Sequence, residues 1–319
     1  MYLDFYGLTE LPFELTATPR FLLTAPSHRE ALSNLRFGVE ARKPLTLLVG
    51  EAGTGKTTLI RAMQGALAEE GGHVCCLSNP TLTRGEFIEW LAAAFDLGRD
   101  AAQSKATMLT TLESALTASR DAGRHVALVV DEAQSLPDEL LEEIRLLANI
   151  EMDGGKLLPI VLAGQPELSR RLNRRRLRQI KQRIALRCEL RPLDLHETAA
   201  FIAGRIRMAG GDSARVFTRE AVTLVHERSA GIPRTICVLC DNALVNGFAL
   251  DRRPVTRDIV LDVCRDFDLG ARPGVAHEAE PIEEKPSGVP EHASQSAGER
   301  AVRETLFAAA VPRRRFRFF

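Results

Sequence analysis

The sequence predicts an α/β fold in which a parallel β-sheet flanked by helices is followed by a small all-helical domain. Short apolar runs of strand length alternate with segments of helical periodicity over residues 45–188, a pattern typical of a parallel sheet covered on both faces. A glycine-rich segment lies between the first of these runs and the helical segment after it. After Pro192 the strand signals stop and only helical periodicity remains, which predicts a domain boundary near this proline.

The elements follow one another in a regular order along the chain. Three prolines between residues 8 and 26 prevent one long helix there, and Ser27 can cap a helix that begins near His28. The expected strands are Leu45–Val49, His73–Ser78, Val126–Val130, Leu158–Ala163 and Ile184–Cys188. The helices expected among them are Thr57–Glu69, Arg84–Phe95, Thr107–Ala122 and Leu136–Ile150. The later helices are expected at Leu195–Met208, Arg219–Ser229, Pro233–Phe248 and Thr256–Phe267.

These patterns divide the chain into three parts. We expect an α/β core over residues 1–191, a helical lid domain over residues 192–269 and a tail over residues 270–319. The tail is rich in Glu, Pro, Ser, Gly and Ala and has little periodicity, so we expect most of it to be disordered. No internal repeat is apparent.

The overall composition excludes several classes of protein. Lys and Arg number 42 and Asp and Glu also number 42, so the net charge does not attract nucleic acid or anionic lipid. No apolar run approaches the roughly 18–20 residues that cross a bilayer, and the N-terminus lacks the pattern of a signal peptide. We therefore expect a cytoplasmic chain without a transmembrane segment. The Cys237–Cys240 pair lacks a second ligand pair at zinc-binding spacing, which favours buried thiols.

The glycine-rich segment matches the phosphate-binding motif GxxxxGK[ST] at every position. Its residues are Gly50, Glu51, Ala52, Gly53, Thr54, Gly55, Lys56 and Thr57. The motif lies between a strand and a helix, where the glycines let backbone N–H groups turn toward phosphate oxygens. Lys56 is expected to contact the β- and γ-phosphates and Thr57 to bind Mg²⁺, and Thr58 completes the predicted nucleotide-binding set. The predicted cofactors are ATP and Mg²⁺.

Two acidic residues follow the third strand. Asp131 and Glu132 come directly after the apolar run Val126–Val130, and the carboxyl ends of strands are where open α/β sheets bind nucleotides. We expect Asp131 to hold Mg²⁺, through a water molecule, and Glu132 to polarise the attacking water. Adjacent acids of this kind are typical of P-loop ATPases that hydrolyse ATP with their own base. A solvated acidic turn is the alternative interpretation.

Together these motifs resemble the ExeA/GspA family of secretion-associated AAA+ ATPases. The resemblance covers about residues 1–268, and the broader relatives are transposition ATPases of the TniB kind and the Orc-type ATPase domain. It rests on the phosphate-binding octapeptide and on Tyr6–Leu8 with Pro12–Phe13, His28 with Ala31–Leu32, Asp131–Gln134 and Gly164–Leu168. The best-known members carry a transmembrane helix and a cell-wall-binding domain after the ATPase. Neither is recognisable here, so peptidoglycan binding and membrane anchoring are not expected.

The resemblance implies three further site residues and an oligomeric state. Gln165 resembles the sensor 1 residue near the γ-phosphate, and Arg234 resembles the sensor 2 arginine of the lid. Arg183 resembles the arginine finger that completes a neighbour's site, with Arg178 and Arg187 as alternatives. An arginine supplied by a neighbour can raise the rate by roughly 10³–10⁵. A homo-oligomer is therefore expected.

A basic stretch leaves two interpretations open. Nine basic residues and no acid lie between Arg170 and Arg187, a density that suits either an oligomer interface or duplex DNA. The last eight residues, from Pro312 to Phe319, combine arginines with phenylalanines and suit a membrane surface, a partner groove or no specific role.

The sequence therefore favours an ATPase that energises or regulates assembly of a secretion or polysaccharide-export system. Its partners would be export-machinery proteins, through which the chain would lie at the inner membrane. The alternatives are a DNA-binding ATPase of the transposition kind and a nucleotide-dependent interaction switch with little turnover.

Overall fold

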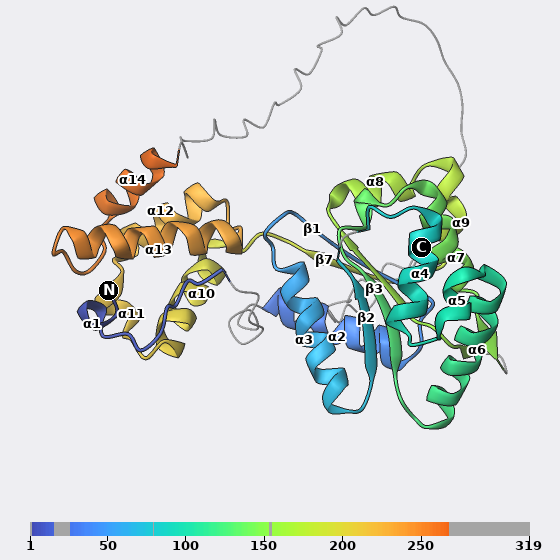
Figure 1. The fold of residues 1–319 in the computed structure, drawn as a ribbon. Coiled ribbons are helices and arrows are strands. Elements are labelled where there is room, and N and C mark those ends of the chain that lie inside the picture. The colour runs from blue at the N-terminus through green and yellow to red at the C-terminus, as the bar shows by residue number, and fades with distance from the viewer. Residues whose placement is uncertain (1, 16–25, 79, 153–154, 268–319) are drawn as a thin grey trace, which may run out of the picture. The chain divides into compact units, whose positions relative to one another are not determined.

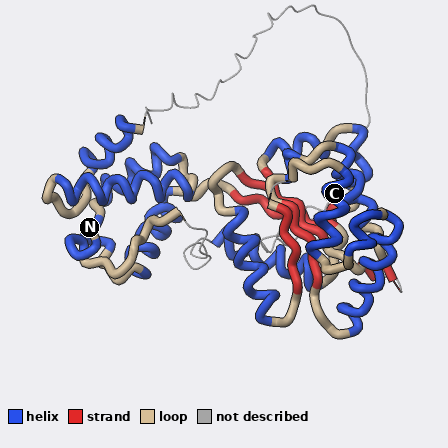
Figure 2. Tube along the Cα trace, viewed as in Figure 1, coloured by secondary structure: helices blue, strands red, loops and turns tan. Residues whose placement is uncertain are grey.

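The computed structural model describes residues 2–15, 26–78, 80–152 and 155–267. A central sheet with flanking helices and a separate group of helices make up these residues (Figures 1 and 2). The predicted tail, residues 270–319, lies outside the described residues. Within the described residues, no helix is long and apolar enough to cross a membrane.

The sheet is parallel throughout, which confirms the predicted fold class. Its strands are β2, β3, β6, β1 and β7 in spatial order. Their bounds are β1 Leu45–Gly50, β2 His73–Leu77, β3 Val126–Val130, β6 Ile160–Gly164 and β7 Ile184–Leu190. All six residues of β1 are buried, because this strand has neighbours on both sides and helices over both faces. The edge strand β7 instead alternates between exposed and less exposed residues over most of its length.

Helices cover the two faces of the sheet. They are α2 Pro26–Glu40, α3 Lys56–Glu69, α4 Arg84–Ala94, α5 Arg99–Gln103, α6 Lys105–Asp121, α7 Asp138–Leu147, α8 Pro166–Leu172 and α9 Arg178–Lys181, with short 3₁₀ turns at η2 Ala133–Ser135 and η3 Arg175–Leu177. Leu48 packs in the cluster that contains residues of α2 and α3, whereas Leu47 packs in the cluster that contains residues of α4, α6 and α7. Successive side chains of a strand point to opposite faces, so β1 contributes to both apolar layers.

The differences from the predicted elements are local. The helix predicted to begin at Leu136 begins at Asp138, because Pro137 has an extended backbone and takes the N-cap position. The short helix α5 and the hairpin of β4 Glu151–Met152 with β5 Gly155–Lys156 were not predicted, since elements of two to five residues carry too little periodicity to be seen.

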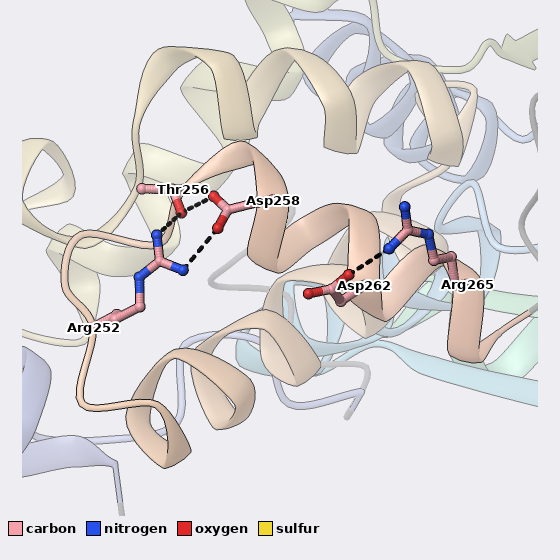
Figure 3. Close-up of polar contacts among 5 residues, drawn as sticks. All are labelled: Arg252, Thr256, Asp258, Asp262 and Arg265. Carbon is pink, nitrogen blue, oxygen red and sulfur yellow. Dashed lines mark hydrogen bonds and ion pairs between the residues drawn. The ribbon is translucent and has the colours of Figure 1, made fainter.

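The helices after residue 194 share one apolar cluster. They are α10 Leu195–Met208, α11 Ser213–Val216, α12 Arg219–Ser229, α13 Pro233–Ala249 and α14 Arg257–Asp266, and we call them the helical module. An ion pair between Arg252 and Asp258, and hydrogen bonds of Thr256 with both residues, join the turn before α14 to its first residues (Figure 3). Hydrogen bonds from Thr256 and Arg252 lower the pKa of Asp258 to about 2.

The opening segment, residues 2–15 with α1 Leu3–Tyr6, differs from the prediction. The sequence assigns it to the α/β core, but its aromatic side chains pack in the apolar cluster of the helical module. The Tyr2 hydroxyl donates to Asp241 at 2.5 Å, and the Thr9 N–H donates to the Ala209 carbonyl at 2.8 Å. Burial of these aromatic rings against the module explains the difference. The predicted boundary near Pro192 stays a prediction.

Gly231 provides a test of the segment that precedes α13. Its φ of +71° is left-handed, and a Cβ built there would lie 2.0 Å from the Leu193 carbonyl oxygen. The Gly231 carbonyl also accepts a hydrogen bond from the Leu193 N–H at 2.8 Å. We expect Gly231→Ala to lower the free energy of unfolding by about 2–4 kcal/mol, because both the backbone conformation and the contact resist a side chain.

The urea midpoint of unfolding measures this effect. Gly65→Ala is the matched control, since Gly65 is exposed within α3 and a Cβ there would meet nothing within 4 Å. That control is expected to be neutral or slightly stabilising. Equal midpoints for wild type and Gly231→Ala would contradict the prediction.

Candidate functional site

The phosphate-binding octapeptide forms the connection between β1 and α3. Gly53 and Gly55 have φ values of +81° and +101°, a left-handed conformation that glycine adopts without strain. A Cβ at Gly53 would also lie 2.8 Å from Cβ of Arg234. The glycines therefore permit both the loop conformation and its close approach to the helical module.

Lys56 is the first residue of α3, and it is buried, with 4% of its surface exposed. Its ammonium donates to the carbonyl oxygens of Gly50 at 2.9 Å and Glu51 at 3.1 Å. Burial lowers the pKa of Lys56, while the nearby carboxylates of Glu132 and Asp131 raise it. The loop thus holds a cation among its own backbone carbonyls and beside two carboxylates.

Thr57 and Asp131 bring two oxygen ligands together. The Thr57 hydroxyl donates to Oδ2 of Asp131 at 2.7 Å, although the two residues lie 74 positions apart. Asp131 is buried at the end of β3, and its N–H donates to the Leu77 carbonyl at 2.9 Å. Hydroxyl and carboxylate oxygens are the ligands that Mg²⁺ prefers, so this donor set fits the ion that the sequence predicts.

Glu132 lies beside this pair in an unusual backbone conformation. Its φ is +51°, which is uncommon for a residue other than glycine. Its carboxylate oxygen Oε2 accepts hydrogen bonds from the side-chain amides of Gln134 and Gln165, the latter at 3.4 Å. The structure therefore brings Gln165, at the N-cap of α8, to the second predicted acid. Gln134 was not predicted as a site residue, although its position two residues after Glu132 was available as a signal.

A cavity of about 320 Å³ adjoins the loop. Its volume is within the range of small-ligand pockets. Residues of the loop, Glu132, the opening segment and the helical module line it: Glu14, Leu15, Ala52, Gly53, Gly55, Lys56, Thr57, Thr58, Glu132, Phe201, Arg205, Pro233, Arg234 and Cys237. A single cavity thus joins a cationic, glycine-rich end to an end that carries apolar and aromatic side chains.

Arg234 reaches the loop from the helical module. It lies in the first turn of α13, directly after Pro233. Its N–H donates to the Gly53 carbonyl at 3.2 Å, and its exposed side chain lines the cavity. The structure therefore brings this predicted residue to the octapeptide.

Arg205 holds the opening segment at the cavity and was not predicted. It is buried, with 7% of its surface exposed, and burial lowers the pKa of its guanidinium. Nη1 donates to the Pro12 carbonyl at 2.9 Å, and the guanidinium lies 4.9 Å from the centre of the Phe201 ring. An arginine within a helical pattern gives no sequence signal for such a role.

His28 contacts the octapeptide from α2. It is buried in α2, and its Nε2 lies 2.8 Å from the Thr54 carbonyl oxygen. Because a carbonyl oxygen only accepts, Nε2 carries the hydrogen. Burial lowers the pKa of His28. The sequence singled out His28 by resemblance alone, without a contact to the loop.

Arg183 is not among the residues that line the cavity. It is exposed, between α9 and β7. Elsewhere in the basic stretch, Asp138 of α7 lies 2.6 Å from Arg171 and 2.5 Å from Arg176, and Glu167 lies 3.2 Å from Arg170. An acid distant in sequence thus partly neutralises a stretch that contains none of its own.

Comparison with known proteins identifies an AAA domain within the chain. Residues 39–172 match a family model described as an AAA domain. General secretion pathway protein A of Aeromonas hydrophila is 38% identical over 249 residues, which make up 78% of this chain and 45% of that protein. The chain therefore spans less than half the length of this curated relative.

Solved structures support the fold. The Aeropyrum pernix ORC2 protein in its ADPNP-ADP complexes aligns with a TM-score of 0.59 and 17% identity, over 80% of this chain and 71% of that one. Its ADP form aligns with a TM-score of 0.53 and 16% identity, over 75% and 67%. At these identities the likeness shows the shared AAA+ fold alone.

Proposed function

We propose that this chain, which contains an AAA domain and is related to General secretion pathway protein A, binds Mg-ATP between Lys56 and Asp131 and hydrolyses it. One observation carries the proposal. The Thr57 hydroxyl and the Asp131 carboxylate meet at 2.7 Å beside the buried Lys56, and Lys56, Thr57 and Glu132 line one cavity.

Binding divides between the two ends of the cavity. Backbone N–H groups of the octapeptide and the Lys56 ammonium bind the phosphates, and the N-terminus of α3 favours the same negative charge. Thr57 and Asp131 hold Mg²⁺, which when bound neutralises charge that develops on the phosphates. The adenine base of ATP binds at the other end of the cavity. That end is formed by Phe201 and by the opening segment, whose backbone Arg205 holds.

The proposed hydrolysis uses Glu132 as the general base. Its carboxylate accepts a proton from a water molecule as the water oxygen attacks the γ-phosphorus. The bond from that phosphorus to the β,γ-bridging oxygen breaks, which gives ADP and inorganic phosphate. Gln165 orients the carboxylate or the water, and Arg234 contacts the phosphates from the helical module.

The dependence of turnover on protein concentration tests this function together with Arg183. If Arg183 completes the site of a neighbouring copy, turnover per chain should rise with concentration, and Arg183→Ala should lower the plateau by about 10³-fold. The affinity for ATP measured on the monomer should not change, because Arg183 does not line its own cavity. Phosphate release at a series of protein concentrations, with and without EDTA, measures this.

Two controls distinguish the outcomes. Arg178→Ala and Arg187→Ala remove the other exposed candidates from the same stretch. If turnover falls in only one of these variants, the role of arginine finger belongs to that residue instead of Arg183. Tight ATP binding without turnover at any concentration would instead favour a nucleotide-dependent switch.

We propose assembly of a secretion or polysaccharide-export system as the process that this ATPase serves. The name of its relative, General secretion pathway protein A, supports this, as does the N-terminal resemblance. The chain would act in the cytoplasm and reach the inner membrane through its partners. Export genes beside its coding gene would support this role, and transposase genes there would count against it.

A DNA-binding role has less support. Arg171 and Arg176, two of the nine basic residues of the stretch, are engaged with Asp138. We therefore propose that the exposed remainder faces a neighbouring copy.

A further inference from the structure

We propose that Gln134 is a positioning residue for Glu132, and that Arg171 and Gly164 hold it in place. The inference rests on the proposed hydrolysis and adds residues that act through Glu132. Gln134 is not among the residues that line the cavity, so its effect would be separate from nucleotide binding.

The hydrogen-bond partners of Gln134 fix the orientation of its amide. Its oxygen Oε1 accepts from the backbone N–H of Gln165 at 3.1 Å, and its nitrogen Nε2 donates to Oε2 of Glu132. A backbone N–H only donates and a carboxylate only accepts. In the reverse orientation the amide NH₂ would face the Gln165 N–H, and the amide oxygen would face the Glu132 carboxylate. Neither pair could form a hydrogen bond, so only the first orientation fits.

Gly164 makes room for this side chain at the end of β6. A Cβ at position 164 would lie 2.7 Å from Oε1 of Gln134 and 2.9 Å from Cδ2 of Leu168. The first distance is too short for a carbon beside an amide oxygen, so a larger residue would displace Gln134 or the start of α8. The absence of a side chain at Gly164 is therefore part of the arrangement.

Arg171 fixes the backbone that carries Gln134. From α8 its guanidinium donates to the carbonyl oxygens of Gln134 and Leu136, the latter at 2.8 Å, and to Oδ1 of Asp138 at 2.6 Å. The planar guanidinium suits several acceptors at fixed angles. These contacts hold the 3₁₀ turn that follows Glu132. The left-handed backbone of Glu132 is strained for a residue other than glycine and needs such support.

The consequence for Glu132 concerns its two oxygens. Oε2 accepts from the amides of Gln134 and Gln165, so rotation of the carboxylate is restrained and Oε1 remains to receive a proton from water. Small errors in the placement of a reacting group can cost about 10²-fold in rate. Gln134 thus acts by holding the base, without touching ATP.

Gln134→Met tests this, because methionine keeps the length of the side chain and removes the amide. We expect kcat to fall about 10–100-fold, with KM and the Kd for ATP within about two-fold of wild type. Gln134→Glu keeps an acceptor for the Gln165 N–H but places a second carboxylate against that of Glu132. Its kcat should fall at least as far as that of Gln134→Met. Gln103→Met is the matched control at an exposed position of α5.

A second variant displaces the Gln134 side chain without changing its amide. Gly164→Ala should lower kcat in the same way, because the added carbon displaces Gln134. In the double variant with Gln134→Met, the fold-reduction in kcat should be smaller than the product of the two single reductions, since the two residues are in contact.

The outcomes separate this inference from the proposed function. An active wild type with Gln134→Met turnover within two-fold of it would overturn the role of Gln134 and leave the ATPase proposal intact. A wild type that binds ATP without turnover would instead count against hydrolysis. In that event, hydrogen exchange of the Gln165 backbone N–H tests the role of Gln134, because this N–H donates to Gln134. The inference requires faster exchange in Gln134→Met than in wild type and fails if the two rates are equal.

Discussion

Glu132→Gln is expected to lower turnover by about 10²–10⁴-fold while ATP binding stays within a few-fold of wild type. The amide cannot accept a proton from water at neutral pH, but it keeps the size of the side chain. The Glu132 carboxylate accepts its hydrogen bonds from Gln134 and Gln165. Neither residue belongs to the octapeptide, so replacement of Glu132 should not disturb the loop. Single-turnover phosphate release, together with titration calorimetry, measures both quantities.

Glu139→Gln is the matched control for this variant. Glu139 is an exposed glutamate in the first turn of α7, so the same chemical change there should leave turnover unchanged. Unaltered turnover in Glu132→Gln would remove Glu132 from the role of base.

Lys56→Ala is expected to weaken ATP binding by about 100-fold or more. The buried ammonium already lies in contact with the carbonyls of Gly50 and Glu51, so it reaches phosphate without the cost of ordering a flexible chain. Titration calorimetry with Mg-ATP measures the loss. Titration with inorganic tripolyphosphate should show a similar loss, because the missing contact is to phosphate.

Lys43→Ala provides the control for the change of charge. Lys43 is half-buried, with its ammonium 5.6 Å from the centre of the Phe37 ring, and it does not line the cavity. Its loss should leave both affinities unchanged. Wild-type affinity for ATP in a folded Lys56→Ala protein would contradict the proposed phosphate site.

The sheet and the phosphate loop were predictable because their signals are local. A motif of eight consecutive residues fixes the loop. The buried strand β3 appears as an unbroken apolar run, and β1 appears as an apolar run interrupted by Thr46. Asp131 could be placed near Lys56 because the carboxyl ends of parallel strands meet at one edge of a sheet. The meeting of Thr57 and Asp131 at 2.7 Å agrees with that expectation.

The contacts that link several distant segments could not be predicted in this way. Gln134 acquires its partners only when the ends of β3 and β6 come together, and Gly164 appeared as part of a resemblance without a steric reason. Arg205 lies in a predicted helix, but helical periodicity does not reveal its contacts with Pro12 and Phe201. The sequence assigns the opening segment to the α/β core because the segment precedes β1 in the chain, whereas the burial of its rings depends on helices some 200 residues later.

Burial of the opening segment within the helical module changes the mechanics of the chain. Arg205 and Asp241 of the module bind Pro12 and Tyr2 of this segment, and Glu14 and Leu15 at its end line the cavity together with Phe201 and Arg234 of the module. A displacement of the module would therefore carry both sets of lining residues with it. The part of the cavity wall that faces the octapeptide would then move as one piece, although its residues lie some 200 positions apart in the sequence.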